Sequence, residues 1–108
     1  MNVASLISPE IIVTPMRAQS RNEAIVELVA LLGDQGHVSD VEATVELVMA
    51  REQERTTGIG EGLAVPHARV PGLKTVQVAV GRPAEGLNWN AFDQKPVRLA
   101  VLVLSPPD

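Results

Sequence analysis

Residues 56–69 read TTGIGEGLAVPHAR, a glycine-rich segment that runs into a short apolar strand and then reaches a histidine. Three glycines within five residues allow positive φ angles and a close approach of the backbone to a bound group. Leu63–Val65 is apolar and suits burial in a sheet, and Pro66 suits the end of a strand because it has no amide hydrogen. We therefore expect His67 to leave the sheet at a defined place, with its ring at the surface.

The sequence before this segment predicts two helices. The first begins at Ser20, which opens a capping box, and it ends at Gly33 or Gly36, because either glycine can adopt the left-handed conformation of a helix end. The second begins at Ser39–Asp40, where either residue is a suitable cap. It continues through a highly charged last turn to Arg55, directly before the glycine-rich loop.

The sequence after the histidine predicts strands. Thr75–Val80 is one strand, Leu87–Asn90 is a short edge strand, and Pro96–Leu104 is the strongest strand in the chain. This last strand is apolar on both faces, which is typical of a central strand that is covered on both sides. With a short extended piece at Ile11–Val13, the pattern predicts one α/β domain over residues 1–108, with a mixed β-sheet flanked by helices.

The composition limits the classes of function. The chain has 9 basic and 13 acidic side chains and a net charge of −4, which argues against a nucleic-acid partner. It contains no cysteine, which excludes disulfides and thiolate chemistry. The run Leu99–Leu104 is too short to span a bilayer, and Met1–Ser5 lacks the features of a signal peptide. We therefore expect a cytoplasmic protein with no membrane insertion.

The glycine-rich loop is a candidate anion site. Backbone amides at Thr57, Gly58 and Gly60 can donate to an anion, although a plain helix C-cap uses the same kind of residues. An imidazole such as that of His67 is a nucleophile when it is neutral. A histidine at a strand end is most often structural, so the loop alone leaves the role of His67 open.

Arginines approach His67 from two directions. Arg69 lies two residues further on, so both side chains share a face if the chain stays extended; otherwise Arg69 is a plain surface cation. Arg51 and Arg55 come from the end of the preceding helix, next to the loop. An imidazole with guanidinium groups around it suits a phosphate, because phosphoryl transfer depends mainly on positioning and charge stabilisation.

Other kinds of site fit the sequence less well. A metal site needs more ligands than His67 and His37, the two histidines of the chain, supply. The sequence has no Gly-x-Ser-x-Gly motif, and no Gly-Lys-Ser/Thr follows its glycines. These glycines also precede a strand rather than a helix, unlike those of a dinucleotide-binding loop. We therefore expect no metal and no cofactor.

A longer pattern resembles a known signature. Glu52 is followed after six residues by Ile59–Gly60, and after two more by residues 63–68, LAVPHA. This order resembles the phosphorylation-site signature of IIA domains of the fructose/mannitol type, from the bacterial phosphoenolpyruvate-dependent phosphotransferase system (PTS). That group includes nitrogen-regulatory IIA proteins. The resemblance extends over the two predicted helices and over residues 78–82 and 93–97, and it implies a three-layer αβα sandwich.

The resemblance implies a phosphotransferase component. In that family His67 would accept a phosphoryl group from phospho-HPr on Nε2 and pass it to a IIB domain, and Arg51 matches an active-site arginine. Arg69 has no counterpart there and rests on strand spacing alone. The alternative is a nitrogen-regulatory protein that controls transporters or kinases by phosphorylation-dependent binding. A third interpretation is a cytoplasmic module of an anion transporter. Such modules have the same fold class and perform no phosphoryl chemistry.

The resemblance also implies that the chain is short at its C-terminus. Domains of the family continue with further helices, which would cover one face of the last strand. Without them, Val97–Leu104 would keep an apolar face exposed. We therefore expect a domain over residues 1–108 that is incomplete at its C-terminus and forms a homo-oligomer through the uncovered strand.

Overall fold

A computed structural model describes residues 9–107 of the chain. A 3-10 turn (Pro9–Ile11) leads into β1 (Ile12–Met16), α1 (Arg21–Asp34), α2 (Val41–Glu54), β2 (Gly58–Gly60), β3 (Leu63–Ala64), β4 (His67–Arg69), β5 (Gln77–Pro83) and β6 (Leu99–Ser105). Met1–Ser5, which lacks the sequence features of a signal peptide, lies outside the described residues. Within them, neither helix has the length and apolar character needed to cross a membrane.

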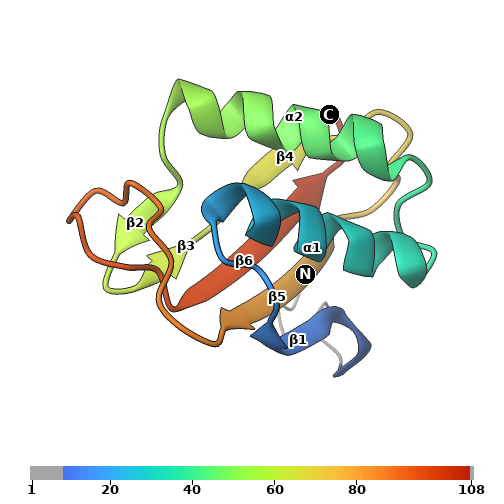
Figure 1. Cartoon of the computed structure of the whole chain (residues 1–108). Coiled ribbons are helices and arrows are strands. Elements are labelled where there is room, and N and C mark those ends of the chain that lie inside the picture. Colours follow the sequence, from blue (N-terminus) through green and yellow to red (C-terminus); the bar gives the residue numbers. More distant parts are fainter. Residues whose placement is uncertain (1–8, 108) are drawn as a thin grey trace.

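The six strands form one mixed sheet with β6 at its centre. The order is β1-β5-β6-β3-β2, and β4 also pairs with β6 (Figure 1). β5 runs antiparallel to β6, whereas β3 and β4 run parallel to it along its other edge. β3 pairs with Leu99 and Ala100, and β4 pairs with Val103–Ser105, so the two short strands share one edge. The predicted central strand and the predicted mixed sheet are confirmed.

Both helices lie over the same face of the sheet (Figure 1). α1 packs against β1, β5 and β6, and α2 packs against α1 and β4. Side chains alternate between the faces of a strand, and Ala100, Leu102 and Leu104 of β6 are fully buried on the helix side. The sheet flanked by helices is therefore as predicted. Within residues 9–107 it forms two layers, without the second helical layer of a three-layer sandwich.

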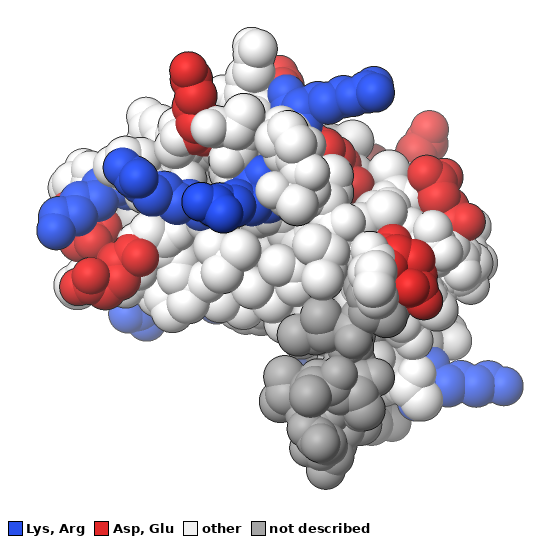
Figure 2. Space-filling model, turned by 90° about the horizontal axis from the view of Figure 1, so that it is seen from below, with Lys and Arg blue, Asp and Glu red and all other residues white. Residues whose placement is uncertain are grey.

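The opposite face of the sheet is apolar and partly open. Leu99 of β6 and Ile12 of β1 are 39% and 40% exposed, and Val80 and Val101 between them are half-buried. On the side of the molecule seen in Figure 2, charged side chains stand around a broad uncharged area. An open apolar face agrees with the expectation for the last strand, while the homo-oligomer remains a prediction.

Local hydrogen bonds explain where α1 begins and ends. The hydroxyl of Ser20 accepts from the amide of Glu23 at 3.2 Å, as expected for the N-cap. The Glu23 carboxylate accepts from the amide of Gln19 at 2.9 Å, so the reciprocal bond is made one residue before the cap. Gly36, with φ 79°, ends the helix, and the amide of His37 donates back into its last turn.

Of three further boundaries, the start of α2 agrees with the sequence prediction and two others differ from it. Asp40 is the cap of α2, and its Oδ1 accepts from an amide in the first turn. The strand that was expected to end at Val80 continues to Pro83, because that segment pairs with β1. The predicted edge strand near Trp89 is reduced to one bridge, between Leu87 and Val97.

Candidate functional site

His67 begins a new strand instead of leaving the sheet. The sequence analysis was wrong on this point, because Pro66 interrupts the ladder only on its nitrogen side. The carbonyl of Pro66 accepts from the amide of Val103 at 2.9 Å, and His67 then pairs with Val103. Ala68 is buried on the helix side, so His67 starts from the other face of an edge strand, where it is half-buried.

One hydrogen bond fixes the imidazole of His67. Its Nδ1 lies 2.9 Å from the carbonyl oxygen of Val65. A carbonyl oxygen can only accept, so Nδ1 carries the hydrogen and Nε2 of the neutral ring keeps its lone pair. Val65 is itself held, because its amide donates to the carbonyl of Thr57 at 2.9 Å. The glycine-rich segment therefore sets the tautomer and the direction of the ring.

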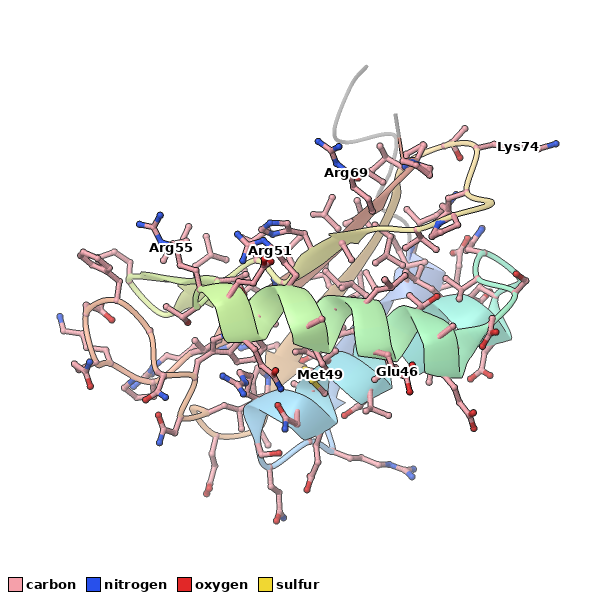
Figure 3. All side chains as sticks on the ribbon, turned by 90° about the horizontal axis from the view of Figure 1, so that it is seen from above. Glu46, Met49, Arg51, Arg55, Arg69 and Lys74 are labelled. Carbon is pink, nitrogen blue, oxygen red and sulfur yellow. The ribbon has the colours of Figure 1, made fainter. Side chains whose placement is uncertain are left out.

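Three arginines stand beside His67. A cavity of about 400 Å³ is lined by His67, Arg51 and Arg55, and a second of about 460 Å³ by His67, Arg51 and Arg69. Figure 3 shows the three arginines on the side of α2 that faces away from α1. Arg51 is half-buried and donates to the carbonyl of Arg55 at 3.1 Å. Arg51 thus lines both cavities together with His67, whereas Arg55 and Arg69 each line only one of them.

A buried carboxylate connects α2 to the loop. Glu52 is only 3% exposed, and it accepts from the amide and the hydroxyl of Thr57 and from Trp89 Nε1. The bond from the Thr57 amide measures 2.7 Å and that from the indole 3.2 Å. Glu52 therefore holds two loops against the end of the helix.

Sequence reasoning gave no role to this network. It used Glu52 only as part of the signature and placed Trp89 only within the predicted edge strand Leu87–Asn90. A signal was present, because a buried indole nitrogen needs an acceptor and a buried carboxylate needs donors.

Two of the three loop amides that were expected to be free, those of Thr57 and Gly58, are already used within the protein. The Thr57 amide donates to Glu52, and the Gly58 amide donates to the hydroxyl of Thr56 at 3.1 Å. Gly60 has φ 106° and lies at the start of the turn between β2 and β3. These residues therefore shape the backbone that carries His67, and in this arrangement Thr57 and Gly58 offer no free donor to an anion.

Gly58 has no room for a side chain. A Cβ placed there would lie 2.7 Å from the Cβ and 2.8 Å from the Cα of Ala91, and the second of these atoms belongs to the backbone. We expect Gly58→Ala to lower the free energy of unfolding by about 1–3 kcal/mol, since overpacking forces backbone shifts. Urea denaturation would measure this loss, and an unchanged midpoint would show that the Ala91 loop moves aside freely.

Asp93 anchors the loop before β6. Its carboxylate accepts from the amides of Lys95 and Glu61, each at 3.1 Å, and these bonds lower the pKa of Asp93 below its ordinary value. A lowered pKa in the folded state stabilises the protein above the ordinary aspartate pKa of about 3.9, and this contribution is lost as the pH falls through the folded value.

We expect Asp93→Asn to be less stable than the natural protein at neutral pH. The difference should shrink as the pH falls, because protonation removes the same charge from the natural protein. Denaturation curves at several pH values would measure this, with exposed Asp34→Asn as the charge-matched control. A difference independent of pH would contradict the assignment.

Other parts of the described chain offer less chemistry. A larger cavity, of about 700 Å³, lies near the N-terminal end of α2, and its lining includes His37 and no arginine. His37 is exposed in the connection between the helices. Residues 9–107 contain no group of three or more histidine, aspartate or glutamate side chains arranged to hold a metal ion.

Comparison with known proteins assigns the chain to a family. Residues 5–108 match the family described as "Phosphoenolpyruvate-dependent sugar phosphotransferase system, EIIA 2". A fructose-specific EIIA component of Haloferax volcanii is 35% identical over 103 residues, covering 94% of this chain and 67% of the relative. The crystal structure of the nitrogen regulatory protein IIA-Ntr from Neisseria meningitidis has a TM-score of 0.90 and 30% identity, covering 98% of this chain and 72% of that one.

The chain belongs to the EIIA 2 family of the phosphoenolpyruvate-dependent sugar phosphotransferase system. A further relative, the 2-O-alpha-mannosyl-D-glycerate-specific EIIABC component of Escherichia coli, is 37% identical over 109 residues. The match covers all of this chain but only 17% of that relative's length. Sugar-specific components and nitrogen regulatory proteins are thus both similar to this chain.

Proposed function

We propose that the protein is a phosphocarrier built on a single IIA-type domain. His67 accepts a phosphoryl group from phospho-HPr and passes it to a IIB domain. The observation that carries this proposal is that His67, whose Nε2 keeps its lone pair in the neutral ring, lines both cavities together with Arg51. Membership of the family supports the reaction class, and the name of the EIIABC relative supports a IIB domain as the acceptor.

The transfer exchanges one phosphorus–nitrogen bond for another. The lone pair on His67 Nε2 attacks phosphorus in line with the donor nitrogen, and the breaking bond returns its electron pair to the donor imidazole. Nδ1 keeps its hydrogen throughout, because it donates to the carbonyl of Val65. Passing the group to a IIB domain repeats the exchange with the acceptor's nucleophile in place of Nε2. No metal or cofactor takes part in the proposed step.

The arginines supply positive charge where the phosphoryl group moves. Arg51 is half-buried, so its guanidinium group is less screened by water than an exposed one and stabilises the oxygens of the phosphoryl group more strongly. Arg69 stands on one side of His67 and adds charge from an exposed position. The proposed role of Thr57, Gly58 and Gly60 is to hold the backbone under His67 rather than to donate to phosphate.

The direct test is phosphorylation with purified components. The protein is incubated with enzyme I, HPr and phosphoenolpyruvate, and its mass is measured before and after acid treatment. We expect an acid-labile gain of one phosphoryl group, which disappears when a fructose-type IIB domain is added. Failure to gain mass under conditions that phosphorylate a known IIA protein would overturn the proposal.

A nitrogen-regulatory role is the second candidate. It is supported by the TM-score of 0.90 with IIA-Ntr from Neisseria meningitidis. In this case His67 is phosphorylated in the same way, but the group is not passed to a IIB domain, and the phosphorylated and unphosphorylated forms bind a transporter or kinase differently. A phosphoryl group that stays on the protein in the presence of fructose- and mannitol-type IIB domains would favour this role.

A further inference from the structure

A chain of hydrogen bonds runs from Glu52 on α2 to the ring of His67. The Glu52 carboxylate accepts from the amide of Thr57 at 2.7 Å. The Thr57 carbonyl accepts from the amide of Val65 at 2.9 Å, and the Val65 carbonyl oxygen lies 2.9 Å from His67 Nδ1. Glu52 is thus connected to the ring that the proposed function uses, although it lines neither cavity at His67.

The two residues in the middle of this chain lie outside regular secondary structure. Thr57 lies between α2 and β2, and Val65 lies between β3 and β4. Connecting segments are more mobile than the elements that they join, so their positions depend on the particular contacts that they make. Thr57 is only 4% exposed, and Glu52 holds it through both its amide and its hydroxyl. The position of the Val65 carbonyl therefore depends on a contact with α2.

Glu52 is itself fixed from the other side. Trp89 is 1% exposed, and its Nε1 donates to the Glu52 carboxylate at 3.2 Å. The segment around the indole is also tied to the residues next to Thr57. The Thr56 hydroxyl donates to the carbonyl of Trp89 at 3.4 Å, and the Phe92 amide donates to the carbonyl of Gly58 at 2.9 Å. The carboxylate is therefore a rigid point from which the chain can be held.

We propose that Glu52 is a positioning residue for His67. By holding Thr57, it keeps the Val65 carbonyl where this group accepts from Nδ1, so that Nε2 presents its lone pair in a fixed direction. A neutral imidazole can carry its hydrogen on either nitrogen. When the Val65 carbonyl is displaced, the hydrogen also occupies Nε2, and the lone pair is then on the wrong nitrogen. This inference rests on the proposed function and adds the residue that prepares the nucleophile.

The test measures the ring and the reaction in the same variants. Glu52→Ala removes the hold on the Thr57 amide and hydroxyl. Nuclear magnetic resonance of protein with ¹⁵N-labelled histidine rings is recorded at a pH at which His67 is neutral. The hydrogen should be on Nδ1 alone in the natural protein and shared between both nitrogens in Glu52→Ala. The maximal rate of phosphoryl uptake from phospho-HPr should fall about ten- to hundredfold, as misplacement of a reacting atom does.

The concentration of phospho-HPr that gives half of the maximal rate should stay the same in Glu52→Ala. Glu52 is 3% exposed, so the change leaves the surface that a donor meets in place. A general loss of folded protein, in contrast, leaves the ring of the remaining folded molecules unchanged. The combination of an altered ring with an altered maximal rate therefore distinguishes positioning from stability alone.

Two further variants grade the effect. Glu52→Gln, the conservative change, keeps an acceptor for the Thr57 amide and a polar group for the hydroxyl, so it should restore the natural ring and the natural rate. Thr57→Val removes only the hydroxyl bond to Glu52. It should fold and show the same changes as Glu52→Ala to a smaller degree, and it decides the question if Glu52→Ala does not fold.

Leu28→Ala is the control for a loss of stability elsewhere. Leu28 is fully buried on α1 and lines neither cavity at His67, and its truncation destabilises by leaving a cavity in the core. Its ring tautomer and its rate should be natural. The same ring change in Leu28→Ala would overturn the inference. A hydrogen on Nδ1 alone in Glu52→Ala and in Thr57→Val would also overturn it, whatever happens to the rate.

Failure of the proposed function gives a different result. If the natural protein takes up no phosphoryl group, the phosphocarrier role is wrong. The comparison of ring tautomers among the natural protein, Glu52→Ala and Thr57→Val needs no donor. It therefore still decides whether Glu52 positions the ring of His67.

Discussion

Replacing His67 by asparagine is expected to abolish phosphoryl uptake completely. The asparagine amide can still donate to the carbonyl of Val65, so the local structure should survive. No nitrogen with a nucleophilic lone pair then remains at the site, because an amide nitrogen is a poor nucleophile. The measurement is the acid-labile mass gain after incubation with enzyme I, HPr and phosphoenolpyruvate, which should be undetectable in His67→Asn.

The second histidine provides the matched control for this variant. His37 is exposed in the connection between the helices, away from both cavities at His67. His37→Asn should therefore take up one phosphoryl group at the natural rate. A mass gain that persists in His67→Asn and disappears in His37→Asn would place the chemistry at the other histidine and contradict the account.

Replacing Glu52 by alanine is expected to cause the largest loss of stability among single substitutions near the site. The change leaves the Thr57 amide and hydroxyl without their buried acceptor, and Trp89 Nε1 keeps only its longer bond, of 3.4 Å, to the Thr57 hydroxyl oxygen. Each unsatisfied buried donor costs about 1–3 kcal/mol, so we expect a loss of about 3 kcal/mol or more in the free energy of unfolding. That is a large share of the about 5–15 kcal/mol that stabilises a typical domain.

Glutamine at position 52 should be far milder, at about 1 kcal/mol. Its carbonyl oxygen can accept from both N–H groups, and its amide can donate to Thr57, whose hydroxyl rotates to accept. Urea denaturation followed by the emission of Trp89, the single tryptophan of the chain, measures both variants. Equal losses for Glu52→Ala and Glu52→Gln would show that packing, rather than hydrogen bonding, explains the effect.

The sequence was sufficient for the parts of the fold that depend on local signals. Ser20 and Asp40 cap their helices through hydrogen bonds within one turn, and Gly36 supplies the positive φ that ends α1. β6 was predictable because it is apolar on both faces. The extension of β5 to Pro83 was not, since it depends on pairing with β1, which is distant in sequence.

The candidate site was predictable in its residues but not in its arrangement. The motif around His67 and the position of Arg51 near the end of α2 predicted that these two residues lie close together, and they line the same two cavities. The Thr57 amide donates to Glu52, which also accepts from Trp89, 37 residues further along the chain, and such a contact between distant residues is not visible in the sequence. The bond from the Phe92 amide to Gly58 is another such contact.

The central claim is that the carbonyl of Val65 holds Nδ1 of His67 and leaves Nε2 to carry the phosphoryl group. Nuclear magnetic resonance of protein labelled with ¹⁵N in its histidine rings, recorded before and after phosphorylation, tests it most directly. The account predicts that phosphorus is coupled to Nε2 of His67 and that Nδ1 stays protonated. Phosphorus on Nδ1, or on His37, would contradict it.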